Sequence, residues 1–246
     1  MLNNKVVFIT GASSGIGAAC AKAFSEAGAK LLLCSRHPAK ISAYKTESYH
    51  FKLDVRHRDE VNQVLNNLPD EWKKIDVLIN NAGLAAGLDN IQDANIQDWE
   101  DMIDTNIKGL LYITRNILPH MVKRNLGHII NIGSISGHEI YPKGAVYCAT
   151  KHAVDVLSRG LRMDLLGTKI RVSSVDPGMV ETNFSHVRFK GDSKRAKAVY
   201  DGMTPLTPED IADAVLYCAT RPPHVNINDM IIMPTDQACA TMVSRK

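Results

Sequence analysis

The sequence predicts a three-layer α/β fold in which a doubly wound parallel sheet of about seven strands lies between two layers of helices. Three observations predict it. Short β-branched or leucine-rich runs recur along the 246 residues, and several are apolar throughout, as expected of strands covered on both faces. Segments with helical spacing separate these runs. The regular alternation of the two kinds of segment indicates parallel strands joined by helical crossovers.

Each expected element follows from its own pattern of residues. The strand-like runs, each about five residues long and rich in Val, Ile or Leu, are Val6–Thr10, Leu31–Ser35, Tyr49–Leu53, Val77–Asn80, His128–Ile132, Ile170–Val175 and Asp229–Met233. The helical segments are Ala18–Ala27, Asp59–Leu68, Trp99–Arg124, Tyr147–Leu166 and Pro208–Thr220. The last helix has a clear start signal, because Thr207 can cap it, Pro208 suits its first position and Asp210 lies three residues after the cap.

Length and composition favour one globular domain over residues 1–246. At about 150 residues per domain the length allows one or two domains, but no internal repeat, low-complexity stretch or Gly/Ser linker divides the chain. Hydrophobic residues make up 45% and charged residues 22%, which excludes a disordered protein. The net charge of +3 is too small to indicate a nucleic-acid or membrane partner.

The cysteines and the N-terminal residues indicate in which cellular compartment the protein is expected. The five cysteines are dispersed, odd in number and without a C-x-x-C pair, which indicates reduced thiols. Only four consecutive apolar residues, Val6 to Ile9, follow the N-terminus, whereas a signal peptide needs about 7–15 and a membrane helix about 20. We therefore expect a cytoplasmic protein.

A glycine-rich turn follows the first expected strand directly and opens the first expected helix. Glycines permit a tight turn and close backbone approach, and the helix N-terminus then offers free N–H groups to a pyrophosphate. The pattern G-x-x-x-G-x-G in a β-α-β frame predicts dinucleotide binding and a Rossmann-like fold, although glycines also make purely structural turns. The candidate cofactor-binding residues of the turn are Gly11, Ser13, Ser14, Gly15, Ile16 and Gly17.

The end of the second strand favours NADP over NAD. An Asp or Glu about 20 residues past the glycines normally holds the ribose 2′-hydroxyl of NAD, and this stretch, Leu33 to His37, has no carboxylate. Arg36 supplies a fixed cation with a planar donor fork that suits a 2′-phosphate. Ser13 could add a hydroxyl and His37 a weak positive contribution. The alternative is that Arg36 is an ordinary solvated surface residue.

Three residues form a candidate catalytic group. Tyr147 and Lys151 are four apart in a helical segment and therefore project from one helix face. A nearby ammonium favours the phenolate, so Tyr147 could act as general acid or base. Ser134 follows a strand at the carboxyl edge of the sheet, where ligands bind, and its hydroxyl could donate to a developing alkoxide. Taken singly, a helical Tyr–Lys pair and a serine after a strand are also common structural features.

Several motifs occur together in one order and spacing. They are TGASSGIG from Thr10, Asn80-Asn81-Ala82-Gly83, Ser134, Tyr147 with Lys151, and Asp176-Pro177-Gly178. On these motifs the whole chain resembles the short-chain dehydrogenase/reductase family. The resemblance implies that Tyr147 is the proton donor and acceptor, and that Lys151 lowers the pKa of Tyr147 and holds the nicotinamide ribose. Ser134 would orient the substrate carbonyl.

The resemblance extends to further residues of the site. Asn106 matches a fourth catalytic member that would hold a water in the proton relay. The residues matched to cofactor contacts are Asp54 and Val55 at the adenine, Asn81, Ala82 and Gly83 at the adenosine ribose, and Pro177, Gly178, Val180 and Thr182 at the nicotinamide and phosphates. No H-E-x-x-H motif or Cys/His cluster occurs, so the sequence predicts no metal site.

A finer resemblance points to one subgroup. The stretch NIGSISG, the run from Phe184 to Asp192, the segment from Leu206 to Asp210 and Val225-Asn226-Ile227-Asn228 look like the NADP-dependent 3-hydroxy acid dehydrogenases. These act on serine, L-allo-threonine and 3-hydroxypropionate-type acids and are usually homotetramers. The chain departs from the subgroup pattern at His138, Glu139 and Lys143, which bring charges near the expected pocket mouth.

The segment at about 184–206 is expected to form a lid over the substrate. Within it, Arg188 could bind a substrate carboxylate, together with Ser134 and Tyr147 as the other substrate contacts. The alternative is that Arg188 and its basic neighbours form a solvated charged stretch. Nucleic-acid binding by the stretch is disfavoured, because its one aromatic residue is Phe189 and no recognised module is present.

The sequence therefore predicts an enzyme that transfers hydride between NADP(H) and a small 3-hydroxy acid, giving a 3-oxo acid or a semialdehyde. Two alternatives remain open. One is a broad NADPH-dependent reductase of ketones and aldehydes. The other is a non-catalytic module that senses NADP(H), although such proteins usually lack the Tyr or Lys that this chain retains as Tyr147 and Lys151.

Overall fold

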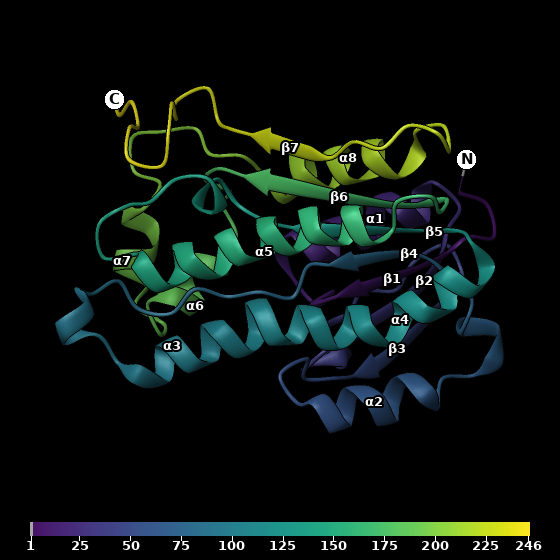
Figure 1. Ribbon diagram of the computed structural model, residues 1–246. Coiled ribbons are helices and arrows are strands. Elements are labelled where there is room, and N and C mark those ends of the chain that lie inside the picture. The colour runs from purple at the N-terminus through teal and green to yellow at the C-terminus, as the bar shows by residue number, and fades with distance from the viewer. Residues whose placement is uncertain (1) are drawn as a thin grey trace.

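The fold is known from a computed structural model, which describes residues 2–246 (Figure 1). Seven strands form one sheet, all neighbours parallel, in the order β3-β2-β1-β4-β5-β6-β7. This confirms the predicted fold class. The strands are β1 (Val6–Thr10), β2 (Lys30–Ser35), β3 (Ser48–Lys52), β4 (Ile75–Asn80), β5 (Gly127–Ile132), β6 (Ile170–Pro177) and β7 (Asp229–Ile232).

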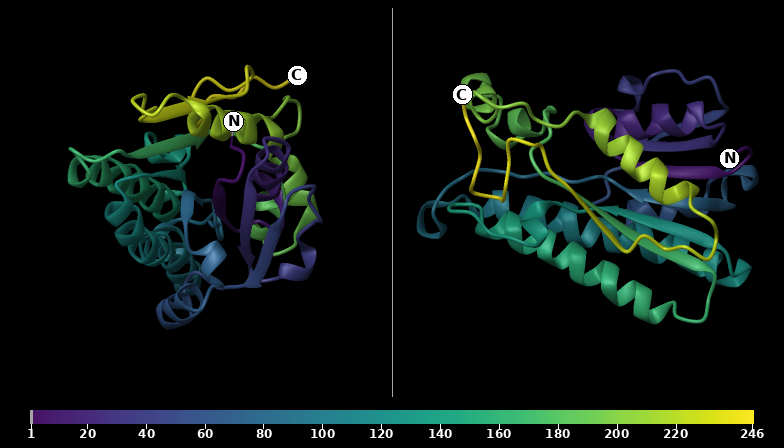
Figure 2. Two further views of the ribbon diagram at one scale, coloured as in Figure 1. Left: turned by 90° about the vertical axis from the view of Figure 1, so that its right-hand side faces the viewer. Right: turned by 90° about the horizontal axis from the view of Figure 1, so that it is seen from above.

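Helices cover both faces of the sheet (Figures 1 and 2). One face packs against α1 and α8, and the other packs against α2, α4 and α5. The helices are α1 (Gly15–Glu26), α2 (Arg58–Asn66), α3 (Ile96–Ile103), α4 (Leu110–Arg124), α5 (Ala145–Asp164), α6 (Phe184–Arg188), α7 (Ser193–Ala198) and α8 (Pro208–Thr220). Short 3-10 turns are η1 (Pro38–Lys40), η2 (Asp70–Trp72), η3 (Ile91–Asp93) and η5 (Ile135–Gly137).

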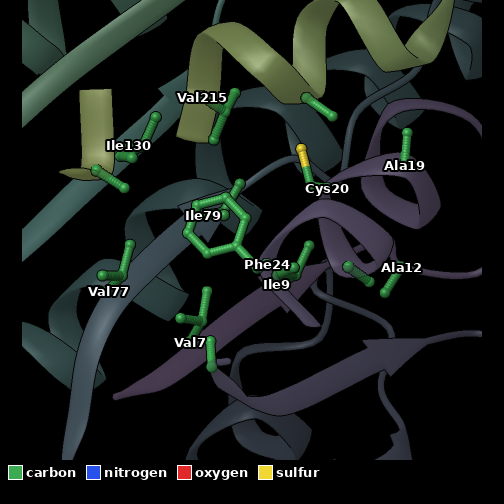
Figure 3. Packing of buried hydrophobic residues seen from close by; sticks show 14 of the residues in the cluster. Val7, Ile9, Ala12, Ala19, Cys20, Phe24, Val77, Ile79, Ile130 and Val215 are labelled. Atoms are coloured by element: carbon green, nitrogen blue, oxygen red, sulfur yellow. The ribbon is translucent and has the colours of Figure 1, made fainter. Parts of the chain in front are cut away.

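The core explains why the strand sequences are apolar throughout. On β1, Val7 and Ile9 belong to the cluster under α1 and α8, whereas Phe8 belongs to the cluster on the opposite face. Figure 3 shows the first cluster, in which Phe24 of α1 and Val215 of α8 belong to the same group of packed side chains as Val7 and Ile9. All five side chains have no measurable exposure, and each fully buried residue of this size stabilises the fold by roughly 1.5–3 kcal/mol.

The predicted start of the last helix is confirmed. The Thr207 side chain accepts a hydrogen bond from the Asp210 N–H at 3.3 Å, and the Asp210 carboxylate accepts one from the Thr207 N–H at 2.7 Å. This reciprocal pair satisfies two amides that a helix start would otherwise leave unpaired. Pro208 occupies the first helical position.

The expected helix Trp99–Arg124 differs in the structure. It is divided into α3 and α4 by a π-helical turn, η4 (Asp104–Gly109). At the end of this turn, a Cβ on Gly109 would lie 2.6 Å from Val55 Cγ2, so the glycine lets the helix approach the end of the third strand closely. Such wider turns are frequent at functional sites, and this one contains Asn106.

Two short helices, α6 and α7, lie within the segment that the sequence predicts as a lid. They were not expected, because five and six residues are too few for a clear helical period. The Asp192 side chain caps α7 by accepting hydrogen bonds from the amides of Lys194 and Arg195. Both helices lie beyond the carboxyl ends of the strands, on the same side as the C-terminus (Figure 1). The lid function itself stays a prediction.

Candidate active site

A cavity of about 730 Å³ opens at the carboxyl ends of the strands. Arg36, Tyr147 and Arg188 all line it. Two predicted site residues, Gly17 and Asn106, lie outside its lining. Those that line it are Gly11, Ser13, Ser14, Gly15, Ile16, Arg36, His37, Asp54, Val55, Asn81, Ala82, Gly83, Ser134, Tyr147, Lys151, Pro177, Gly178, Val180, Thr182 and Arg188.

The glycine turn has the geometry that its sequence predicts. Gly11 and Gly15 adopt the left-handed conformation, with φ of +67° and +53°. A Cβ on Gly17 would overlap the Gly11 carbonyl oxygen and lie 2.5 Å from Asn81 Nδ2, so only glycine fits there. No side chain of the described residues caps the N-terminus of α1, which leaves its first amides free to bind a phosphate.

The turn is braced by the loop that follows β4. The Asn81 side-chain amide donates to the Thr10 carbonyl at 2.8 Å. In return, the Thr10 hydroxyl accepts from the amides of Asn81 and Ala82 at 3.1 and 2.9 Å. The two motifs, 70 residues apart, therefore form one rigid wall of the cavity.

The part of the cavity next to the end of β2 is lined by basic side chains. Arg36 follows β2, is exposed, and makes no ion pair or hydrogen bond among residues 2–246. His37 lies beside it, with its amide bonded to the Ser35 hydroxyl at 3.1 Å. Lys40, which the sequence reasoning did not single out, also lines this part of the cavity. The sequence signal that could have identified Lys40 is a second basic residue four positions after Arg36.

Asp54, predicted to contact adenine, is already engaged by a neighbour. Its carboxylate accepts hydrogen bonds from the Arg56 guanidinium at 2.8 to 3.1 Å, and Arg56 also reaches Asp101 at 2.8 Å. Burial alone would raise the pKa of Asp54, but the hydrogen bonds and charge of Arg56 lower it overall. The carboxylate is therefore ionised and fixed in orientation, and its contact with adenine stays a prediction.

Tyr147 and Ser134 both line the cavity. Tyr147 is 8% exposed and packs edge-on against Phe184, with ring centroids 5.7 Å apart. Ser134 caps η5 by accepting from the Ser136 amide at 3.1 Å. Burial raises the pKa of Tyr147 above its usual range, and Tyr141 adds to this, while the Ser134 hydroxyl and the Arg188 charge oppose it.

Lys151 is buried on α5, four residues after Tyr147. Its ammonium donates to the Ile132 carbonyl at 2.9 Å and lies 6.0 Å from the centre of the Tyr147 ring. Burial lowers the pKa of Lys151 to about 8, and the charge of Asp176 opposes that change. Because burial raises the pKa of Tyr147 here, the expected lowering of that pKa by Lys151 stays a prediction.

Asn106 lies behind the cavity, on the π-helical turn. Its side-chain amide donates to the Leu84 carbonyl at 2.9 Å and to the Thr150 hydroxyl at 3.0 Å. Its side-chain oxygen accepts from the Leu84 amide at 2.9 Å. Because both amide hydrogens are used, a water held by Asn106 would have to bind its backbone or remaining lone pair. The water-holding role stays a prediction.

The loop from Pro177 to Thr182 is held by the C-terminal segment. The Gly178 amide donates to the Ile232 carbonyl at 2.7 Å, and the Met179 amide donates to the Gln237 side chain at 2.8 Å. A Cβ on Gly178 would lie 2.5 Å from Gln237 Oε1, so the glycine permits this close contact. Sequence reasoning missed Gln237, because nothing local marks a glutamine near the C-terminus.

Arg188 approaches Tyr147 from α6. Its Nε donates to the Gly87 carbonyl at 2.9 Å, and one terminal nitrogen donates to the Tyr141 hydroxyl at 3.0 Å. The guanidinium carbon lies 5.9 Å from the centre of the Tyr147 ring. Tyr141, also missed from the sequence, therefore helps to position a cation beside the predicted proton donor.

Comparison with known proteins identifies the family. A model described as short chain dehydrogenase matches residues 5–193, most of the chain. The protein belongs to this family and is an oxidoreductase acting on CH–OH groups. Within residues 2–246, every helix is too short or too polar to cross a membrane.

Several individual relatives cover nearly the whole chain. The NADP-dependent 3-hydroxy acid dehydrogenase YdfG of Salmonella typhi is 49% identical over 240 residues, covering 96% of this chain and 97% of the relative. An NADP-dependent 3-hydroxy acid dehydrogenase of Schizosaccharomyces pombe is 44% identical and covers 100% and 98%. Among solved structures, a closed serine dehydrogenase complexed with NADP+ has a TM-score of 0.92 at 44% identity, covering 98% and 99%.

Proposed function

We propose that the protein is an NADP-dependent dehydrogenase of small 3-hydroxy acids, which it oxidises to 3-oxo acids or semialdehydes. One observation carries the proposal: a single cavity is lined by Arg36 and also by Arg188, whose guanidinium carbon lies 5.9 Å from the centre of the Tyr147 ring. The relatives named above, NADP-dependent 3-hydroxy acid dehydrogenases, support the same activity.

The lining fits NADP(H) along its length. The uncapped start of α1 suits the pyrophosphate, because its free amides and positive helix end favour an anion. Arg36, which has no carboxylate partner among the described residues, suits the 2′-phosphate, with Ser13, His37 and Lys40 beside it. Lys151 and Thr182, farther along, would hold the nicotinamide half.

The chain's own residues would manage the proton. Bound NADP+ would supply the acceptor for the hydride that leaves the hydroxyl-bearing carbon of the substrate. The Tyr147 oxygen, as phenolate, takes the proton from the substrate hydroxyl, and in the reverse direction the phenol returns it. Ser134 donates a hydrogen bond to the same substrate oxygen, while the Lys151 ammonium stabilises the phenolate.

Arg188 would select a carboxylate. Two of its nitrogens are already bonded to Gly87 and Tyr141, which fixes the direction of the guanidinium. A fixed guanidinium near Tyr147 can bind a carboxylate through its remaining N–H groups and so present the neighbouring carbons to the phenol. This geometry favours a hydroxy acid over a neutral alcohol.

The test is a substrate panel followed at the reduced-nicotinamide absorbance. We expect turnover of L-serine, L-allo-threonine or 3-hydroxypropionate with NADP+. If all three acids are inert while neutral ketones or aldehydes are reduced, the protein is a broad carbonyl reductase instead. If NADPH binds but nothing turns over, it is a sensing module.

The proposal includes a homotetramer in the cytoplasm. Exposed apolar side chains on α4 and α5, at 40% to 78% exposure, could form an interface between copies; they are Leu111, Val122, Val156 and Met163. Light scattering during gel filtration tests the assembly, and a monomer would contradict it. Four of the five free cysteines are buried, and reduced thiols suit a reducing compartment.

A further inference from the structure

A buried acid lies behind the proposed catalytic residues. Asp176, near the end of β6, is only 1% exposed. One of its carboxylate oxygens accepts from the Ser174 hydroxyl at 2.6 Å, and the other lies 3.0 Å from His138 Nε2. A carboxylate so deeply buried is costly unless a nearby charge or hydrogen bonds compensate it. The His138 and Ser174 contacts supply part of that compensation.

The Asp176 carboxylate fits against the backbone that carries the proposed catalytic residues. Its Oδ1 occupies the space that a Cβ on Gly133 would take. Gly133 lies between Ile132, whose carbonyl holds the Lys151 ammonium, and Ser134. The acid and the lysine therefore approach the same short segment, and any side chain on Gly133 would displace the acid.

The charge of Asp176 affects the pKa of Lys151. Burial lowers the pKa of Lys151 to about 8, and the charge that raises it is that of Asp176. Without this anion a buried ammonium would lose its proton at a lower pH. The proposed chemistry needs the ammonium, because a neutral amine cannot stabilise the Tyr147 phenolate.

His138 ties the acid to the turn that presents Ser134. Ser134 and His138 are the residues that cap η5 at its two ends, and the Ser134 hydroxyl donates to the Pro177 carbonyl at 3.5 Å. Both ends of the turn are thus attached to β6. Because His138 is 26% exposed in its side chain, a substitution there can be made without opening the core.

We propose that Asp176 is a positioning residue that supplies the counter-charge of Lys151, and that His138 holds the Asp176 carboxylate in the required orientation. The inference rests on the proposed roles of Tyr147 and Lys151. It gives a role to His138, one of the positions at which the sequence departs from the pattern of the 3-hydroxy acid dehydrogenase subgroup.

The other charged groups nearby are engaged elsewhere. Asp229 on β7 acts weakly on Asp176 and is itself paired with Arg162 at 3.1 Å. Glu139, next to His138, accepts a hydrogen bond from the Ala240 amide at 2.6 Å. Among the groups named here, Lys151 is therefore the cation on which the Asp176 charge acts, and His138 is a hydrogen-bond partner of Asp176.

The deciding measurement is the pH profile of kcat for Asp176→Asn, which keeps the shape and removes the charge. We expect the rising limb for alcohol oxidation to move up by about one pH unit or more, with about tenfold lower kcat at pH 7, because the phenolate loses support. The substrate KM should change much less. Ser174→Ala, which removes a hydrogen bond to the same carboxylate but keeps the carboxylate itself, should move the limb in the same direction by much less than Asp176→Asn does.

A second pair tests His138. His138→Leu removes the donor to Asp176 and should shift the limb in the same direction by a smaller amount. His138→Gln keeps a donor and should restore most of the wild-type profile. These two variants also test the proposal if Asp176→Asn does not fold. A pH profile of kcat that is unshifted in His138→Leu would overturn the proposal.

A folded Asp176→Asn enzyme with the wild-type pH profile would likewise overturn it. The profile can be recorded with any hydroxy acid or carbonyl compound that the enzyme turns over. Failure of the substrate assignment would therefore leave this test readable. Failure of the catalytic assignment would be seen separately, as full activity of Tyr147→Phe.

Discussion

The proposed phosphate end and the proposed substrate end of the cavity are built in different ways. At the phosphate end, a strand, three glycines and a helix start follow one another within residues 6–17, so local spacing determines the geometry. At the substrate end, Arg188 depends on Gly87, 101 residues away, and on Tyr141, 47 residues away. The cofactor class can therefore be predicted from sequence, whereas substrate selection depends on contacts that form only in the folded chain.

The largest loss of activity should come from a change at Tyr147, the proposed proton donor and acceptor. Tyr147→Phe removes the acid–base oxygen and should lower kcat by about a thousandfold, as loss of general acid–base catalysis does. NADPH binding, measured by fluorescence, should change little. Tyr217→Phe on α8, 46% exposed, is the matched control and should be active. Near-normal turnover by Tyr147→Phe would show that another group moves the proton.

Gly17→Ala tests the rigidity of the phosphate end. Its Cβ would overlap the Gly11 carbonyl and reach Asn81, so the turn must open. We expect a loss of about 1–3 kcal/mol of stability, as for overpacked sites, and a large loss of NADPH affinity. Gly160→Ala, where a Cβ meets nothing within 4 Å, should be neutral or stabilising. Equal melting temperatures for both variants would refute the steric argument.

Arg36→Ala asks whether the phosphate end discriminates between cofactors. Losing charged hydrogen bonds to a 2′-phosphate should weaken NADPH binding by about ten- to a hundredfold. NADH affinity should stay nearly constant. Arg58→Ala on α2, with a side chain 66% exposed, is the control. An equal loss for both cofactors would mean that Arg36 does not bind the 2′-phosphate.

Arg188→Ala should have a smaller effect, confined to the substrate end. Part of the guanidinium is already bonded within the protein, so we expect about a tenfold loss of kcat/KM for hydroxy acids. Neutral carbonyl compounds should lose much less. Lys194→Ala, exposed in the same segment, controls for general loss of positive charge. A uniform loss for acids and neutral substrates would assign Arg188 to lid structure alone.

The same contrast explains what the sequence could and could not predict. The strands, the glycine turn and the Thr207 capping box follow from short-range patterns, and the structure agrees with them. Gln237 and the His138–Asp176 pair depend on segments far apart in the chain, which local spacing does not encode. The π-helical turn was missed because helical periodicity continues through one inserted residue.

The brace between Thr10 and Asn81 has a consequence for folding. The hydroxyl and carbonyl of Thr10 find their partners only after β4 has docked beside β1, across a separation of about 70 residues. Contacts of such high contact order form slowly, because a long loop must close first. We therefore expect the nascent chain to acquire affinity for its cofactor late, after the central sheet has assembled, so that a cofactor cannot act as an early folding template.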